Sequence, residues 1–146
     1  PELRPIPPGN LATHKPAKLL STDGTHSLIA SGFAFARYGV DGHAWTWAQG
    51  AYEWAWMYHV DLERPYAIRR VAINFGGGWA TEYKVHVSED GFTWNTVAHA
   101  ADCMGGRMEH ALDGSPVRYI RVEAVKPDGP DQEGVQMAIA ELEAYE

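Results

Sequence analysis

Short runs of alternating apolar and polar residues, separated by turns that contain glycine or proline, constrain the fold of this chain most strongly. The clearest run covers residues 83–88. It leads into Asp90-Gly91, a favoured hairpin pair, before strand character resumes over residues 92–97. Further candidate strands cover residues 56–62, 69–74, 108–112, 117–125 and 139–145. Because no segment shows sustained helical periodicity, the sequence predicts an all-β fold, an antiparallel β-sandwich.

The alternation also assigns individual side chains to the core. Successive residues of a strand point to opposite faces, so every second residue of a half-buried strand is expected to be apolar and inward-facing. In the two clearest runs, the inward residues are expected to be Tyr83, Val85, Val87, Ile120 and Val122.

The length and the ends of the chain indicate one domain preceded by a linker. The chain has 146 residues, which is enough for a single substantial hydrophobic core. Residues 1–9 contain four prolines and are expected to form a linker, which leaves residues 10–146 for the domain. No apolar run is long enough to span a bilayer, and no signal-peptide pattern is present. Because the chain opens on Pro1, we expect it to be a piece of a larger protein.

The composition excludes two classes of protein and disfavours a third. The one cysteine, Cys103, cannot form an intramolecular disulfide, so the chain is not a disulfide-stapled scaffold. The net charge of -7 argues against nucleic acid and other polyanions, whose phosphates are neutralised by an excess of lysine and arginine. The same charge opposes docking on an anionic membrane.

Six segments, in order along the chain, together carry a family resemblance. They read NLATHKPA (10–17), VDGHAWT (40–46), VDL with YAIRRV (60–71), EYKVHVSEDGFTW (82–94), VRYIRV (117–122) and IAELEAY (139–145). This pattern resembles the coagulation factor 5/8 type C, or discoidin, domain, a group that includes the family 32 carbohydrate-binding modules. The resemblance implies a β-sandwich jelly roll of the galactose-binding-like kind, with its variable loops gathered at one end.

The resemblance also implies a structural calcium ion. Asp41, Thr46 and Glu141 match the family positions that bind it with their side chains. The carbonyl donors implied are those of Tyr38, His43 and Ala140. Calcium takes six to eight oxygen ligands, and carboxylate, hydroxyl and carbonyl oxygens suit it. The alternative is an ordinary Asp-Gly turn and a solvated glutamate.

Aromatic residues are concentrated in one stretch, where Trp45, Trp47, Trp54 and Trp56 fall within twelve residues. Trp56 and Tyr58 share the parity of the apolar positions that follow them and are expected in the core. Trp94, which closes the predicted hairpin, is also expected there. The family has one buried tryptophan after the calcium loop, and the register leaves open whether Trp45 or Trp47 supplies it.

The remaining aromatic residues are candidates for binding a sugar. A pyranose ring stacks its C–H face on an aromatic side chain, while planar polar side chains bind its hydroxyl groups. Trp79 follows three glycines, 76–78, that let a backbone approach a ligand closely, although its ring could instead fold onto the sheet edge. The full set of predicted ligand-binding residues is Trp79, Trp54, Tyr52, Trp45, Glu82, Arg107, Gln132 and Gln136. Each polar member could equally be an ordinary solvated loop residue.

The sequence therefore predicts a non-catalytic carbohydrate-binding module. No hydrolase, zinc-protease or Cys/His motif is present, and the histidines are scattered. Galactose-binding relatives carry an arginine in the loop that here holds only glycines, Trp79, Ala80 and Thr81, so a glucan or another polysaccharide is favoured. We expect a neutral oligo- or polysaccharide ligand, a covalently linked glycoside hydrolase or polysaccharide lyase, and an extracellular or cell-surface location. The alternatives are an adhesion-type domain for a protein or membrane surface, and a spacer without a ligand.

Overall fold

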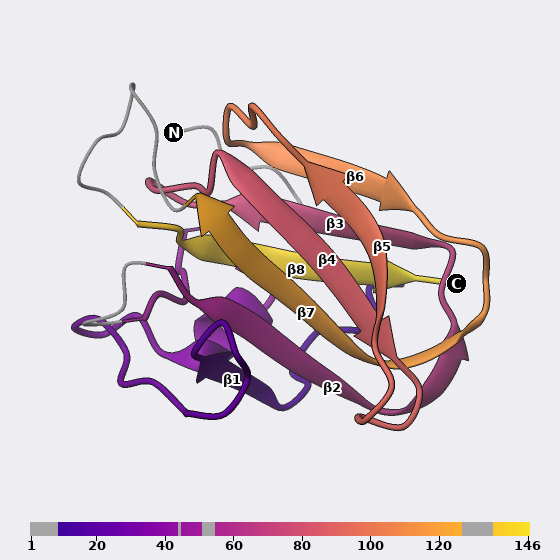
Figure 1. The fold of residues 1–146 in the computed structure, drawn as a ribbon. Helices are drawn as coiled ribbons and strands as arrows, with labels where there is room; N and C mark the ends of the chain where they lie inside the picture. Colours follow the sequence, from indigo (N-terminus) through magenta and orange to yellow (C-terminus); the bar gives the residue numbers. More distant parts are fainter. Residues whose placement is uncertain (1–8, 44, 51–54, 127–135) are drawn as a thin grey trace.

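The fold consists of two antiparallel sheets packed face to face, as the ribbon of the computed structural model shows (Figure 1). The structure describes residues 9–43, 45–50, 55–126 and 136–146. One sheet has the strand order β1-β2-β7-β4-β5 and the other has the order β6-β3-β8. The elements are β1 (Ala17–Leu20), the 3-10 turn η1 (Ala36–Gly39), β2 (Met57–Ala67), β3 (Arg70–Phe75), β4 (Glu82–Ser88), β5 (Asn95–Ala100), β6 (Arg107–Ala111), β7 (Pro116–Lys126) and β8 (Ile139–Tyr145). The predicted β-sandwich is confirmed.

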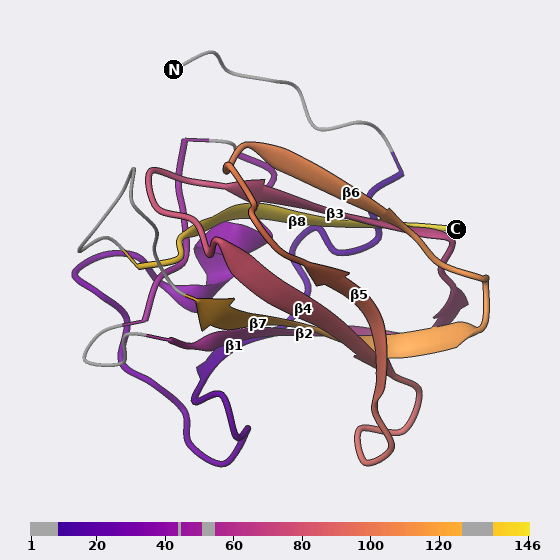
Figure 2. The ribbon, with the colours of Figure 1, turned by 45° about the horizontal axis from the view of Figure 1, so that its top comes forward.

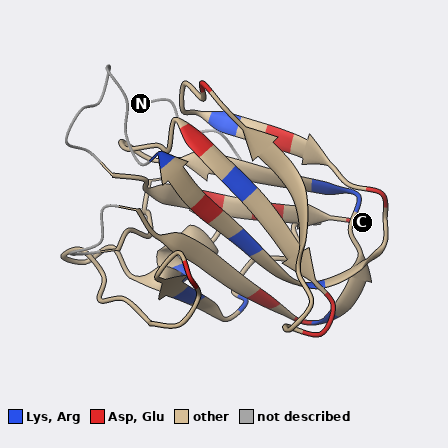
Figure 3. Ribbon diagram, viewed as in Figure 1, with Lys and Arg blue, Asp and Glu red and all other residues tan. Residues whose placement is uncertain are grey.

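The second view separates the two layers, with β6, β3 and β8 on one side and β1, β2 and β7 on the other (Figure 2). Charged residues of both signs lie along the five-stranded sheet, and they alternate on β4 and β7 (Figure 3). No helix within the described ranges is long and apolar enough to cross a membrane.

The observed strands agree with those that the alternation pattern predicts. The ends of a strand differ from the prediction where a side chain closes a turn beside it. β8 begins and ends as predicted. β5 begins at Asn95 instead of residue 92, because Asp90 Oδ1 accepts hydrogen bonds from the backbone N–H groups of Phe92 and Thr93, both at 2.8 Å. The first segment of the domain is also a turn before β1, where Asn10 Oδ1 accepts from the backbone of Ala12.

The core lies between the sheets and contains the residues that parity assigned to it. Tyr83, Val85 and Val87 are buried, as are Ile120 and Val122. Burying such large apolar side chains provides most of the driving force for folding.

Two aromatic residues of the core also make polar contacts with distant segments. Trp56 and Tyr58 are fully buried, as predicted. Trp56 Nε1 donates to the Met137 carbonyl at 2.8 Å, and the Tyr58 hydroxyl donates to the Ala36 carbonyl at 2.6 Å. Buried Tyr and Trp need such partners for their polar ends.

The prediction that Trp94 belongs to the core is wrong. Trp94 precedes β5 and lies half-buried on the outer face of the five-stranded sheet. The Arg121 guanidinium lies 4.0 Å from the centroid of its ring, and the His59 ring is beside it at 6.1 Å. Because Trp94 stands in the loop and not in the strand, the alternation of β5 does not determine its face.

Candidate functional site

An open aromatic pocket of about 550 Å³ lies at the end of the sandwich that carries the loop of residues 40–46, where the family resemblance implies a calcium ion. Its wall is formed by Phe33, Tyr38, Trp45 and Trp47, with Ser31 and Gln49 among the polar residues. Phe33, Trp45 and Trp47 are 85%, 57% and 45% exposed. Large aromatic rings so accessible and so close together are unusual outside binding sites.

The prediction that either Trp45 or Trp47 is buried is therefore wrong. The position next to the core is taken by Ala48, which is fully buried and pairs with Ile139 across an isolated bridge. With the small residue Ala48 at that bridge, the rings of Trp45 and Trp47, which precede it in the sequence, lie on the surface, and Trp56 fills the core nearby. Phe33 was not among the predicted site residues, and Tyr38 was expected only as a carbonyl donor to calcium, because neither ring lies in a periodic segment.

Backbone pairing between two loops forms the base of this pocket. The Ser31 N–H donates to the Gln49 carbonyl at 2.9 Å, and the Gln49 N–H donates to the Ala34 carbonyl at 3.1 Å. The Gln49 side chain in turn donates to the Gln136 carbonyl at 2.9 Å. Such cross-links hold the two loops in one arrangement, as a preformed binding site requires.

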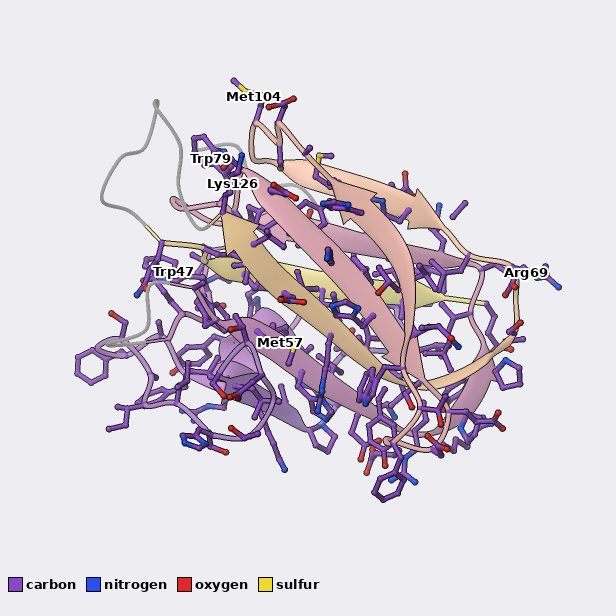
Figure 4. All side chains as sticks on the ribbon, in the orientation of Figure 1. Trp47, Met57, Arg69, Trp79, Met104 and Lys126 are labelled. Atoms are coloured by element: carbon purple, nitrogen blue, oxygen red, sulfur yellow. The ribbon has the colours of Figure 1, made fainter. Side chains whose placement is uncertain are left out.

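Trp47 connects the pocket to the glycine loop that precedes Trp79. A Cβ atom on Gly76 would lie 3.5 Å from Trp47 Cβ, so the glycine backbone runs directly beside this tryptophan. Figure 4 shows Trp47 and Trp79 at the same end of the sandwich. The three glycines thus permit a close approach between protein segments, in addition to any role toward a ligand.

Trp79 is anchored within its loop. Its indole N–H donates to the Cys103 carbonyl at 3.0 Å, and the ring packs against Gly105, where a Cβ atom would come within 2.9 Å of Trp79 Cδ2. The residue is half-buried and packs against the core, so one side of the ring is covered by protein. Stacking of a sugar on Trp79 stays a prediction.

The polar residues predicted to bind ligand are engaged within the protein. Arg107 forms a two-bonded ion pair with the buried Glu143, with N–O distances of 3.1 and 3.0 Å. Glu82 accepts a hydrogen bond from His99 at 2.5 Å. The Gln136 side chain donates to the Gly50 carbonyl.

Among these three, only Gln136 belongs to the network under the aromatic pocket, through Gln49. Tyr52, Trp54 and Gln132 lie outside the described residues.

The side chains predicted to bind calcium come together at the rim of the same pocket. The Thr46 hydroxyl donates to Asp41 Oδ2 at 2.5 Å, and the His43 N–H donates to Asp41 Oδ1 at 3.0 Å. Glu141 reaches this loop from β8, and its two carboxylate oxygens accept from the Gly42 N–H at 3.3 and 3.2 Å. Residues 99 positions apart in sequence thus face each other.

Glu141 is a fully buried carboxyl group that lacks a cationic partner within the described ranges. Burial raises its pKa to about 9, and the nearby carboxyl group of Asp41 contributes to the rise. Glu143, two residues further along β8, is equally buried but is neutralised by Arg107. An uncompensated buried carboxylate is costly, and a bound cation would remove that cost.

The expected carbonyl donors come from three segments, the loop after η1, η1 itself and β8. The His43 carbonyl lies 3.4 Å from the Thr46 hydroxyl, and Tyr38 belongs to η1. Ala140 is skipped in the β3–β8 register, which shifts between Asn74 and Phe75, so it occupies a β-bulge. No group of three or more His, Cys, Asp and Glu side chains placed for a metal occurs in the described part of the chain. The donor set, two carboxylates with hydroxyl and carbonyl oxygens, fits a hard cation such as calcium.

A second cavity, of about 500 Å³, differs in chemistry. It lies between the β4–β5 hairpin and the segment before β7, and its lining includes Glu89, Asp90 and Asp113 but no aromatic side chain. It lacks the exposed rings that characterise the aromatic pocket.

Cys103 is buried, and burial raises the pKa of its thiol, so it is a poor nucleophile.

Comparisons with a family model and with solved structures agree on the kind of domain that this chain forms. The family model of the F5/8 type C domain matches residues 21–141. No curated protein sequence matches significantly. Chitosan-binding module 1 of a chitosanase/glucanase from Paenibacillus sp. IK-5 superimposes with a TM-score of 0.79 at 23% identity, over 94% of this chain and 98% of that one.

Two further solved structures extend the similarity. Chitosan-binding module 2 of the same Paenibacillus enzyme, in complex with chitotriose, gives a TM-score of 0.78 at 23% identity, covering 94% and 100% of the two chains. CpGH89CBM32-4 from Clostridium perfringens, in complex with GlcNAc-α-1,4-galactose, gives 0.75 at 15% identity, covering 92% of each. At these identities the likeness establishes a common fold.

Proposed function

Because the chain belongs to the F5/8 type C domain family, we propose that it is a non-catalytic carbohydrate-binding module whose ligand stacks in the aromatic pocket. The observation that carries the proposal is the exposure of Trp45, Trp47 and Phe33 in the lining of that pocket. Aromatic faces bind the C–H face of a sugar ring, while Gln49 and Ser31 supply polar groups for hydroxyls. The structural neighbours that bind chitosan and other glycans support this role.

We further propose that calcium binds at Asp41, Thr46 and Glu141. The support is the fully buried Glu141 carboxyl group, which has no cationic partner among the described residues, together with the Asp41 carboxyl group beside it, which accepts a hydrogen bond from the Thr46 hydroxyl. The ion supplies positive charge and orders its oxygen ligands. Asp41 and Thr46 then hold the loop that carries Trp45 and Trp47, while Glu141 ties this loop to β8.

The ligand is proposed to be a polysaccharide without acidic groups. The described residues that line the pocket include no lysine or arginine to neutralise an anion. The protein carries a net charge of -7, which disfavours polyanionic polymers. A neutral glucan is the first expectation. Chitosan, the ligand named for two neighbours, is the competing one, because its protonated amines would be attracted by the acidic surface.

The cellular setting of the module is also a proposal. Some structural neighbours are modules of glycoside hydrolases. We propose that this chain likewise holds a linked glycan-active enzyme on its polysaccharide outside the cell, where weak sites gain from multivalency.

The test is a titration with cellotriose, chitotriose and galactose, followed by calorimetry and tryptophan fluorescence. Wild type is expected to bind one of the two gluco-configured trisaccharides. Trp45→Ala and Trp47→Ala should each weaken binding at least tenfold, as expected for loss of a stacking ring. Phe92→Ala is the matched control, since Phe92 is 90% exposed but lies on the β4–β5 hairpin. Equal binding by all three variants would contradict the proposal.

A second function is favoured by one observation. Ile29 and Phe33, in the loop beside the pocket, are 71% and 85% exposed. Apolar tips of this kind suit an adhesion-type domain that docks on a protein or membrane surface. Vesicle pelleting with neutral and anionic lipids separates the two functions: binding lost in Ile29→Asp and Phe33→Asp, without any sugar binding, would favour adhesion. Binding of neither sugars nor vesicles would favour a spacer without a ligand.

A further inference from the structure

A row of five side chains crosses the outer face of the five-stranded sheet. The strand registers pair Lys18 of β1 with His59 of β2, His59 with Arg121 of β7, Arg121 with His86 of β4, and His86 with Thr96 of β5. Because facing residues of neighbouring strands point to the same side, these side chains lie in line. The row contains two permanent cations and two histidines, and it lies outside the aromatic pocket.

Arg121 occupies the middle of this row in an aromatic setting. Its guanidinium lies 4.0 Å from the centroid of Trp94, and its Nε donates to His59 Nδ1 at 3.0 Å. His59 is itself stacked against Tyr119, with 5.6 Å between ring centroids. On the other side the guanidinium adjoins Gly24, where a Cβ atom would lie 3.1 Å from Nη1. The side chain is thus held in one orientation, half-buried.

No carboxylate of the described residues pairs with Arg121. Arg107 and Arg118, by contrast, form two-bonded ion pairs with Glu143 and Asp61, and these carboxylates raise their pKa values. The pKa of Arg121 is lowered by burial alone. Its Nη1 and Nη2 groups donate to no described residue, so the end of the guanidinium fork is unused.

The acidic side chains near Arg121 are paired with other groups. Asp61 binds Arg118, and Glu123 binds His86 at 2.7 Å. Asp23 accepts hydrogen bonds from Ser21 and Thr25 within its own loop. A partly desolvated cation with no counter-charge is unfavourable, and an external anion would supply the missing partner.

We propose that Arg121 is a binding site for a single carboxylate group, presented by a uronic acid residue or by a free small carboxylate. The planar Nη1/Nη2 edge matches the two oxygens of a carboxylate and can bind both. Lys18 is exposed on β1, two strands away at a Cα distance of about 10 Å, and adds positive charge at the β1 end of the row. The Trp94 ring stacks on the guanidinium and holds it in a cation–π contact.

The site takes one carboxylate and not an acidic polymer. His86 is paired with Glu123 and Lys84 lies near Glu82 and Glu123, so the positive potential does not extend along the face. The overall charge of -7 likewise opposes a polyanion. The inference is independent of sugar stacking in the aromatic pocket.

The experiment titrates the protein with sodium glucuronate, sodium acetate and glucose at constant ionic strength, with sodium chloride as the balancing salt. Tryptophan emission and the melting temperature are followed, since Trp94 lies directly under the guanidinium. Glucuronate is expected to shift the emission and raise the melting temperature, and glucose is not. An acetate response equal to that of glucuronate identifies a general carboxylate site, whereas a response to glucuronate alone identifies a uronic acid site; both support the proposal.

Three variants make the test specific. Arg121→Lys keeps the charge but loses the fork, and it is expected to weaken binding at least tenfold while its circular dichroism stays native. Arg64→Gln is the matched control, because Arg64 is an exposed arginine stacked at 4.0 Å on Tyr66. Trp47→Ala should leave carboxylate binding unchanged, which separates this site from the pocket. The proposal is overturned if glucuronate acts no differently from chloride. It is also overturned if Arg121→Lys binds glucuronate as tightly as wild type and the Arg64→Gln control do.

Discussion

Arg107 and Glu143 form a two-bonded ion pair across the three-stranded sheet, in which the glutamate is fully buried and the arginine is about one-quarter exposed. Asn74 and Tyr145 also donate to this carboxylate. The charge of Glu143 is therefore fully compensated, and the pKa of its carboxyl group is lowered by these donors against the effect of burial. Arg107 has a structural role at the sheet.

Arg107→Ala is expected to destabilise the fold by about 3 kcal/mol, because it leaves a buried carboxylate without its cation. Urea unfolding followed by circular dichroism measures the change. The double variant with Glu143→Gln should recover part of the loss, since the amide carries no charge to compensate. Sugar affinity should stay unchanged in whatever fraction is folded. Weakened sugar binding with normal stability would instead return Arg107 to the ligand site.

Calcium is expected to raise the melting temperature of the protein, and excess EDTA to lower it. Glu141→Gln should abolish this response while raising the melting temperature of the calcium-free protein, because an amide replaces a buried carboxyl group that has no cationic partner among the described residues. Differential scanning calorimetry with and without calcium measures both effects. Glu89→Gln, at an exposed carboxylate, is the control. A melt unaffected by EDTA would argue against a metal at this site.

The strands could be predicted because their evidence is local. Along residues 82–87 of β4 and 119–125 of β7, buried residues alternate with more exposed ones, so a period of two is visible over six or seven residues. β8 was located with its correct ends, although it is buried on both faces. Alternation does not predict where a turn holds the backbone. Asp90 Oδ1 accepts hydrogen bonds from the backbone of Phe92 and Thr93, so β5 begins only at Asn95.

The site was harder to predict because its contacts join distant parts of the chain. Trp45 and Trp47 lie in a loop without periodicity, and only the bridge between Ala48 and Ile139 shows why both are exposed. The partner of Arg107 is 36 residues away, so its local sequence resembles that of a free loop arginine. Family resemblance, in contrast, brought Asp41 together with Glu141, a pairing that no local pattern indicates.

Stability is expected to fall as the pH is lowered from 7 to 4, with His59 a major cause. Burial and the neighbouring charges of Arg121 and Lys18 lower the pKa of His59 from 6.5 to about 4. Between these values the unfolded chain binds a proton that the folded protein does not, so stability present above pH 6.5 is lost as the pH falls through 4. At about 1.4 kcal/mol per pH unit, the loss approaches about 3 kcal/mol.

Urea midpoints at pH 7, 5.5 and 4.5 measure this dependence. His59→Gln keeps an acceptor for the Arg121 Nε–H but cannot be protonated, so its midpoint should vary less with pH than that of wild type. His14→Asn, at an exposed histidine before β1, is the control and should retain the wild-type slope. Identical slopes in wild type and His59→Gln would show that another group is responsible.

Replacing Gly105 with alanine is expected to destabilise the protein more than the same change at Gly106. Both glycines have positive φ, +81° and +74°, so alanine is strained by a similar amount at each position. Only at Gly105 would the new Cβ atom also collide with Trp79, at 2.9 Å from Cδ2 and 3.0 Å from Cε3, whereas Gly106 has open space. The difference between the two variants therefore isolates the packing of the indole ring, and we expect it to be about 1–3 kcal/mol.

Two readouts follow this pair of variants. Urea unfolding gives the difference in stability, and tryptophan emission reports whether the Trp79 ring has moved from its place over Gly105. A shift in emission for Gly105→Ala alone is expected, because the ring must leave the loop or break its hydrogen bond to Cys103. If both variants lose the same stability and emit alike, Trp79 does not pack on this loop in solution.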